Sequence, residues 1–326
     1  MNKLNPKLFD KDVDRQPTRQ GYGEGLVEAG EYDKKVIVLC ADLTESTKSD
    51  LFKKKFPDRF IEVGVAEQNL ATLAAGMANY GKIPFISSYA CFSPGRNWEQ
   101  IRTTIALNDL PVKIVGAHAG LTVGPDGATH QALEDLATMR VMPNMTVIYP
   151  CDAVEAKKAT VAAAKTDHPV YLRLAREKTA VITTVDSPFE IGKAEILADY
   201  GYDAAIIACG PLMYQSLVAA KELNNEGVKI MVVNCHTLKP LDKPTLLKVA
   251  RDCGAIVTVE EHQIHGGLGG AVAELLSTNL PTPMEFVGMP DRFGESGQPD
   301  ELLSKYGMDV VSIKHAVKKV ITRRRC

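Results

Sequence analysis

Short runs of apolar, largely β-branched residues alternate along the first half of the chain with longer stretches in which apolar residues recur at helical spacing. These runs, which we interpret as buried strands, are residues 36–39, 60–63, 84–86, 112–115, 146–149 and 170–172. Strands that alternate with helices in this way predict a doubly wound, mainly parallel sheet.

The rhythm breaks near residues 181–188, where a proline and several polar residues replace the helical pattern. It then resumes with apolar runs at 204–208, 229–233, 255–259 and 284–287, and with helical patterns such as 213–224. We therefore predict an α/β protein with two doubly wound three-layer domains, at residues 1–184 and 190–326, joined by a short linker.

Composition places the chain among ordinary globular proteins. Its 326 residues are 45% hydrophobic and 24% charged, with a formal net charge of −2. No run approaches the roughly 20 apolar residues of a membrane span, and no basic excess indicates nucleic acid as a partner. The first residues lack the apolar segment of a secretory signal. Seven cysteines without a Cys-x-x-Cys pair suggest reduced thiols in a cytoplasmic protein.

Candidate chemistry is concentrated in the glycine-punctuated stretch 116–131, which contains His118, Asp126 and His130. It follows the predicted strand 112–115 and precedes a predicted helix at 131–139. A loop at the carboxyl end of a parallel strand is where ligands usually bind in α/β sheets. We expect no metal here, because a fourth ligand is not placed nearby.

Several segments in a fixed order resemble the pyrimidine-binding domain of transketolase and of related thiamine diphosphate enzymes. They are Gly64-Val-Ala-Glu67-Gln, Ser88-Tyr-Ala-Cys-Phe92 and Gly124-Pro-Asp-Gly-Ala-Thr-His-Gln131. The similarity extends to Cys40-Ala-Asp42-Leu-Thr-Glu-Ser46 and to Val259-Glu-Glu-His-Gln-Ile-His-Gly-Gly-Leu-Gly269. Any one segment alone would be weak evidence, whereas their shared order is specific.

The resemblance implies cofactor contacts for four residues. Glu67 would hydrogen-bond N1′ of the aminopyrimidine ring, Phe92 or Tyr89 would stack on that ring, and Asp42 would touch the thiamine. Taken without the resemblance, Glu67 is simply a glutamate in the first turn of a helix, favoured by the helix dipole. Asp42, after a strand, would be an ordinary helix cap.

The resemblance also implies a substrate channel. His118 would lie near the sugar phosphate, Asp126 on the C2 hydroxyl of the acceptor and His130 near the reacting carbonyl or hydroxyl; both histidines are candidate catalytic residues. Histidine suits such proton transfers near neutral pH. Arg19, Arg176 and Ser46 match the phosphate-binding positions, and guanidinium groups bind phosphate oxygens bidentately. Strand alternation places Arg173 on a different face from Arg176.

One family motif is missing from the sequence. The Gly-Asp-Gly segment that holds the diphosphate through Mg²⁺ has no counterpart, since the single Asp-Gly pair, Asp126-Gly127, lies in the substrate loop. The chain therefore resembles the C-terminal subunit of a split transketolase. This implies an N-terminal partner subunit that carries the diphosphate and Mg²⁺ site, a heterotetramer of two chains of each kind, and no activity without the partner.

The function expected from the resemblance is transfer of a two-carbon ketol unit between ketose and aldose sugar phosphates, in pentose phosphate metabolism. Three alternatives stay open: the β subunit of a 2-oxo acid dehydrogenase, a fragment similar to 1-deoxyxylulose-5-phosphate synthase, and a non-catalytic homologous subunit. The set of candidate sugar-phosphate residues favours ketol transfer over a small oxo acid. The preferred sugars are not determined by the sequence.

Overall fold

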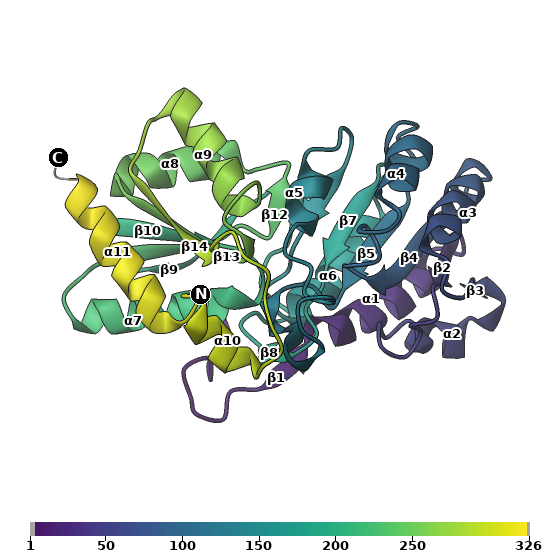
Figure 1. Cartoon of the computed structure of the whole chain (residues 1–326), viewed down its shortest axis with the longest axis horizontal. Helices are drawn as coiled ribbons and strands as arrows, with labels where there is room; N and C mark the ends of the chain where they lie inside the picture. Colours follow the sequence, from purple (N-terminus) through teal and green to yellow (C-terminus); the bar gives the residue numbers. More distant parts are fainter. Residues whose placement is uncertain (1–3, 325–326) are drawn as a thin grey trace.

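The structure is a computed structural model that describes residues 4–324, and it contains two α/β domains that lie side by side (Figure 1). The first is built on a seven-stranded sheet in the order β12-β6-β7-β5-β4-β2-β3. All neighbouring strands in it are parallel except β12 and β6. The strands are β2 (Val36–Cys40), β3 (Phe60–Glu62), β4 (Ile83–Tyr89), β5 (Lys113–Ala117), β6 (Thr146–Ile148), β7 (Val170–Arg173) and β12 (Thr237–Lys239).

Helices cover both faces of this sheet. On one face α1 (Thr18–Tyr32) and α6 (Ala153–Ala164) pack together over buried strand residues, with α2 (Asp50–Lys55) beside them. On the other face lie α3 (Glu67–Asn79), the π-helical segment η2 (Ile101–Ala106) that continues α4 (Trp98–Gln100), and α5 (Asp135–Arg140). The short helix η1 spans Pro57–Arg59, and a small antiparallel pair joins β1 (Arg15–Pro17) to β8 (Lys178–Ala180).

The second domain has a five-stranded sheet in the order β14-β13-β10-β11-β9. Only its edge strand β9 is antiparallel to its neighbour. The strands are β9 (Glu195–Asp199), β10 (Ala204–Ala208), β11 (Ile230–Asn234), β13 (Ile256–Gln263) and β14 (Met284–Met289). Helices α7 (Met213–Asn225) and α11 (Val310–Arg324) contribute to the core on one face, and α8 (Lys243–Cys253) and α9 (Leu268–Asn279) to the core on the other. The remaining helices are η4 (Gly210–Leu212) and α10 (Pro299–Lys305).

The predicted fold class, two doubly wound α/β domains, is confirmed, and each apolar run predicted as a strand overlaps a strand. The helix predicted at 131–139 is wrong at its start, because α5 begins only at Asp135. The residues just before α5 make contacts within the loop and with the second domain instead. Ala132 forms a parallel bridge with Ala119, and the Gln131 side chain donates hydrogen bonds to the carbonyls of Leu121 and Glu295.

The strand β12 crosses between the domains. Its residues Thr237–Lys239 follow β11 of the second sheet, yet they pair with β6 at the edge of the first sheet (Figure 1). Nearby, Asn234 of β11 donates a 2.7 Å hydrogen bond to the carboxylate of Glu155 on α6. The two domains are thus joined by backbone pairing and by buried polar contacts as well as by the linker.

No helix between residues 4 and 324 is long and apolar enough to cross a membrane. Six cysteines in that range are free, namely Cys40, Cys91, Cys151, Cys209, Cys235 and Cys253. The seventh, Cys326, lies outside the described residues.

Candidate active site

The carboxyl ends of four neighbouring strands, β7, β5, β4 and β2, carry most of the predicted site residues. This is the edge of a parallel sheet at which ligands bind. Asp42 and Ser46 follow β2, Tyr89 ends β4 with Phe92 just beyond it, His118 follows β5, and Arg176 follows β7; Glu67 is the first residue of α3, and Arg19 is the second residue of α1. The sheet topology therefore explains how distant segments reach one place.

Tyr89, Phe92, His118 and His130 form one aromatic cluster. The Tyr89 ring stacks on the His118 imidazole with centroids 4.0 Å apart. His130 meets Phe92 edge-on at 5.6 Å and Tyr89 at 6.2 Å, and Tyr89 and Phe92 lie 6.2 Å apart. Tyr89, Phe92 and His130 are only half-buried. The cluster thus combines apolar ring faces with two imidazoles at an accessible edge of the sheet.

His118 combines a left-handed backbone conformation with an imidazole whose pKa is strongly lowered. Its backbone has φ +52°, a left-handed conformation that a non-glycine residue rarely adopts. Burial, reinforced by the charges of Arg19 and Arg176, lowers the pKa of its imidazole to about 3. The ring is therefore neutral near pH 7. An Arg19 guanidinium nitrogen lies 3.5 Å from Nε2, and Nδ1 is buried without a hydrogen-bond partner among residues 4–324.

Glu67 is almost completely buried, with 1% of its surface exposed. Ser88 Oγ donates a hydrogen bond to Oε1 at 3.0 Å, and Arg96 donates one to Oε2 at 2.7 Å. The Asn97 side chain donates to the Glu67 carbonyl at 2.9 Å. The Arg96 guanidinium also lies over the Phe92 ring, 4.8 Å from its centroid. Arg96 therefore links Glu67 to the aromatic cluster.

The candidate anion-binding residues are only partly brought together. Arg19 donates a 2.7 Å hydrogen bond to the Ser46 carbonyl, so Ser46 contacts it through its backbone. Arg176 donates a 2.8 Å hydrogen bond to the Val123 carbonyl, inside the loop 116–131. Asp126, at the end of η3 (Leu121–Asp126), is exposed, and within residues 4–324 it makes no hydrogen bond or ion pair with the cluster. Asp42 is also exposed, and its backbone N–H donates to Glu62.

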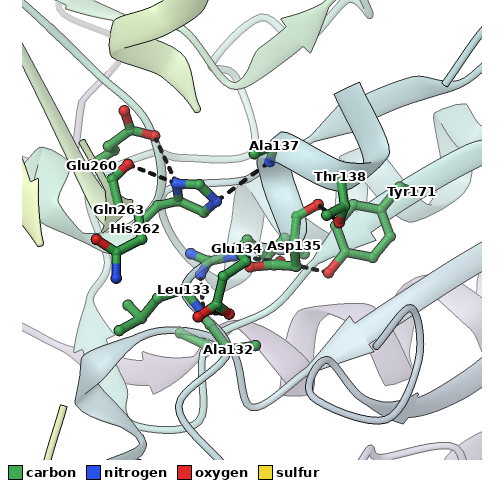
Figure 2. A network of polar contacts seen from close by, with 12 residues as sticks. Ala132, Leu133, Glu134, Asp135, Ala137, Thr138, Tyr171, Glu260, His262 and Gln263 are labelled. Atoms are coloured by element: carbon green, nitrogen blue, oxygen red, sulfur yellow. Dashed lines mark hydrogen bonds and ion pairs between the residues drawn. The ribbon is translucent and has the colours of Figure 1, made fainter. Parts of the chain in front are cut away.

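A buried polar network that we did not predict holds the residues directly after the loop 116–131 (Figure 2). Asp135 accepts hydrogen bonds from the Tyr171 hydroxyl at 2.6 Å and from Arg173 at 2.8 Å. Arg173 also donates to the Ala132 carbonyl at 2.9 Å. Burial alone would raise the pKa of Asp135, but the neighbouring Arg173 charge holds it below its usual value. Arg173 is fully buried, so it cannot serve as a phosphate ligand at the surface.

Acidic and imidazole side chains on β13 of the second domain also contact this loop and α5. Figure 2 shows His262 between Glu260 and the start of α5, where Ala137 N–H lies 3.4 Å from His262 Nε2. Glu260 itself accepts hydrogen bonds from the first backbone N–H groups of α9, and Glu261 accepts one from Thr122 N–H at 2.5 Å. The loop 116–131 and the residues that follow it thus contact side chains of both domains.

Comparison with known proteins defines the class to which this arrangement belongs. Residues 14–181 match the transketolase pyrimidine-binding domain, and residues 192–313 match the transketolase C-terminal domain. The chain belongs to the transketolase family, whose pyrimidine-binding domain implies thiamine diphosphate as the cofactor of the family enzyme. Within that family it corresponds to the C-terminal section of a split transketolase, as its relatives show.

One similar protein is a putative transketolase C-terminal section of Methanocaldococcus jannaschii. It is 47% identical over 298 residues, which are 90% of this chain and 93% of that protein. A 6-deoxy-6-sulfo-D-fructose transketolase subunit of a Clostridium species (strain MSTE9) is 38% identical, with 97% and 98% of the two chains covered. A solved structure described as a split gene transketolase, inactive beta4 tetramer, is 46% identical with a TM-score of 0.89, covering 95% of this chain and 99% of that one.

Proposed function

We propose that this chain, together with an N-terminal partner subunit, transfers a two-carbon ketol unit between ketose and aldose sugar phosphates in pentose phosphate metabolism. The observation that carries the proposal is the placement of the buried Glu67 carboxylate beside the Tyr89, Phe92, His118 and His130 cluster, at the carboxyl edge of a transketolase pyrimidine-binding domain. Six unpaired cysteines among residues 4–324 support a cytoplasmic location.

The residues present fit the aminopyrimidine ring of thiamine diphosphate. A planar heteroaromatic ring needs an apolar face to stack on, which the half-buried Phe92 and Tyr89 rings offer. A ring nitrogen needs a partner carboxylate, which Glu67 supplies from a buried position. Asp42, at the same sheet edge, is a further candidate contact. When bound, thiamine diphosphate supplies an electron sink for cleavage of a carbon–carbon bond next to a carbonyl.

The chain's own residues would bind the sugar and move its protons. Neutral His118 has a buried Nδ1 that lacks a partner among the described residues, and this imidazole would hydrogen-bond a sugar hydroxyl. His130, at the rim of the cluster, is the candidate for proton transfer at the reacting carbonyl or hydroxyl. Arg19 and Arg176 would bind the terminal anion with Ser46, and Asp126 would accept a hydrogen bond from the acceptor hydroxyl.

The proposal includes a partner subunit for two reasons. The sequence contains no Gly-Asp-Gly segment, and residues 4–324 contain no group of three histidine, cysteine or acidic side chains that could hold a metal. We infer that the diphosphate and Mg²⁺ are held by the partner, in an assembly of two chains of each kind. Val65, two residues before Glu67, is exposed and offers an apolar side chain for such a contact.

The test is reconstitution. The purified chain is mixed with a candidate partner that carries Gly-Asp-Gly, thiamine diphosphate and Mg²⁺, and ketol transfer between sugar phosphates is assayed. We expect activity from the mixture only. Full activity from this chain alone would refute the need for a partner, and inactivity of a stable assembly would favour the non-catalytic alternative.

A second assay arm addresses the substrate. Sulfonated and phosphorylated ketoses both present a terminal anion, and the Clostridium relative is described as acting on a sulfonated sugar. Our proposal expects a higher kcat/KM for the phosphorylated ketose. A clear preference for the sulfonated sugar would overturn the phosphate assignment while leaving ketol transfer intact.

A further inference from the structure

The Glu67 carboxylate cannot be reached from solvent in the free chain. Only 1% of the residue is exposed; Ser88 and Arg96 donate hydrogen bonds to its carboxylate, and Asn97 donates one to its backbone carbonyl. Ser88 and Asn97 are fully buried, whereas 46% of the Arg96 side chain is exposed. Of these three, Arg96 therefore lies on the solvent side, and a ligand that approaches Glu67 from solvent has to displace it.

Arg96 also makes the two contacts that a stacked heteroaromatic ring would make. Its guanidinium is planar and rich in N–H groups. It donates to Glu67 Oε2 at 2.7 Å and lies 4.8 Å from the centroid of the Phe92 ring. Because one group holds both contacts, a ring that takes over the carboxylate and this ring face must replace the guanidinium.

We propose that Arg96 is a gate on Glu67, which covers the carboxylate and the Phe92 ring in the free chain and moves aside when the aminopyrimidine ring of thiamine diphosphate binds. The inference rests on the proposed function, which assigns Glu67 and Phe92 to that ring. A flexible, half-exposed side chain can swing into solvent without disturbing the core. Since only the open fraction binds, the closed pair lowers the apparent affinity for the cofactor.

The gate is tested first on the free chain by carboxyl labelling. The chain is treated with a carbodiimide and an amine, and incorporation at Glu67 is followed by mass spectrometry. We expect slow labelling in the wild type and labelling about tenfold faster in Arg96→Gln, because a charge-assisted hydrogen bond that covers the carboxylate is lost. Arg96→Lys should be intermediate, since its ammonium keeps the charge without a planar group over Phe92.

A matched control is Arg102→Gln, which removes an exposed arginine of the adjacent segment η2 and should label at the wild-type rate. Circular dichroism and thermal melting establish that each variant is folded. If Arg96→Gln is unfolded, Arg96→Lys takes its place in the comparison. Wild-type labelling of Glu67 in a folded Arg96 variant would overturn the gate.

The second measurement is the Kd of thiamine diphosphate with Mg²⁺ for the complex with the partner, determined by calorimetry. A gate predicts binding about threefold to tenfold tighter in Arg96→Gln, because the closed state no longer competes. Weaker binding in that variant, in a complex whose wild type binds and turns over, would overturn the gate and make Arg96 a positioning residue for Glu67. Absence of cofactor binding by the wild-type complex would instead overturn the proposed function.

Discussion

His118 is the residue at which backbone strain, burial and charge coincide. Its φ of +52° follows directly on the buried strand β5, and its ring is stacked on Tyr89. Strained non-glycine backbone persists only where the surroundings over-determine it, and it concentrates at functional sites. The neutral imidazole that results is suited to hydrogen bonding rather than to carrying charge.

We expect the His118 imidazole to show no titration between pH 5 and pH 8, because burial first and Arg19 second lower its pKa from 6.5 to about 3. The unfolded chain binds the proton more readily. The stability that His118 contributes is therefore complete above pH 6.5 and is lost as the pH falls toward 3. NMR titration, with the resonance assigned by His118→Asn, measures this, and a midpoint near 6.5 would contradict the prediction.

Glu67→Gln should leave the fold intact and lower ketol transfer by the reconstituted enzyme by about a hundredfold or more, as expected for loss of a group that exchanges protons. The side chains are nearly isosteric: the amide oxygen can still accept from Arg96, and the amide NH2 can donate to the Ser88 hydroxyl, which rotates to accept. Turnover is compared with that of Glu190→Gln, which alters an exposed glutamate in the linker region. Near-normal turnover of Glu67→Gln would rule out its assigned role.

The sequence and the family resemblance were sufficient to nominate Glu67, His118 and His130, because each lies in a recognisable segment. They could not identify Arg96 or Ser88 as partners of Glu67, since these contacts span 29 and 21 residues and depend on how α3 packs against β4. Arg173 shows the converse. Alternation along β7 separated it from Arg176, but only the structure shows it fully buried against Asp135.

At the scale of elements, Asp152 begins α6 and also fixes the linker to it. Its carboxylate caps the helix by accepting from Glu155 N–H and accepts hydrogen bonds from the backbones of Ile182 and Thr183 and from the Thr183 hydroxyl. It is completely buried. One side chain therefore satisfies donors of two segments that would otherwise be buried without partners.

Asp152→Ala should lower the free energy of unfolding by about 3 kcal/mol, because a helix cap and several hydrogen bonds to a buried carboxylate disappear together. Asp152→Asn should cost less, since one oxygen remains as an acceptor. Urea denaturation gives both values. Asp186→Ala, at an exposed position nearby, should change stability little. An equally small effect of Asp152→Ala would show that the linker is held by other contacts.

Strands buried in the centre of a sheet were predictable, because nearly all their residues are apolar: every residue of β2, β5, β10 and β11 is buried, and Lys113 and Asn234 are the polar exceptions. The shorter pieces β1, β8 and β12 carry no such run, and β9 is half-exposed at an edge. The start of α5 was mispredicted because Gln131 and Ala132 pair within the loop, a tertiary preference that overrides a helical pattern.

At the scale of the molecule, Glu155 joins the two domains in a pH-dependent way. Burial first and Asp152 second raise the pKa of this carboxyl from 4.5 to about 7. Between these values the folded chain holds a proton that the unfolded chain has released. The stabilisation is therefore fully present below pH 4.5 and is lost as the pH rises through 7.

We expect stability measured by chemical denaturation to fall less steeply between pH 5 and pH 8 in Glu155→Gln than in the wild type. The amide cannot ionise, although it loses part of the bonding to Cys151 N–H and Asn234. The difference between the two pH profiles reports Glu155 alone, because groups whose pKa is lowered by folding, such as His118, contribute equally to both profiles. Identical slopes would mean that Glu155 is already ionised in the folded chain.

The crossing of β12 into the first sheet sets the order in which the molecule can be completed during synthesis. Domains generally fold from the amino-terminal end as the chain emerges. Here β6 keeps an unpaired backbone edge until residues 237–239, which lie beyond three strands of the second sheet, have been made. Such an edge can pair with other nascent chains, so the first domain cannot be finished as an independent piece, and cutting at the linker would leave it without its outermost strand.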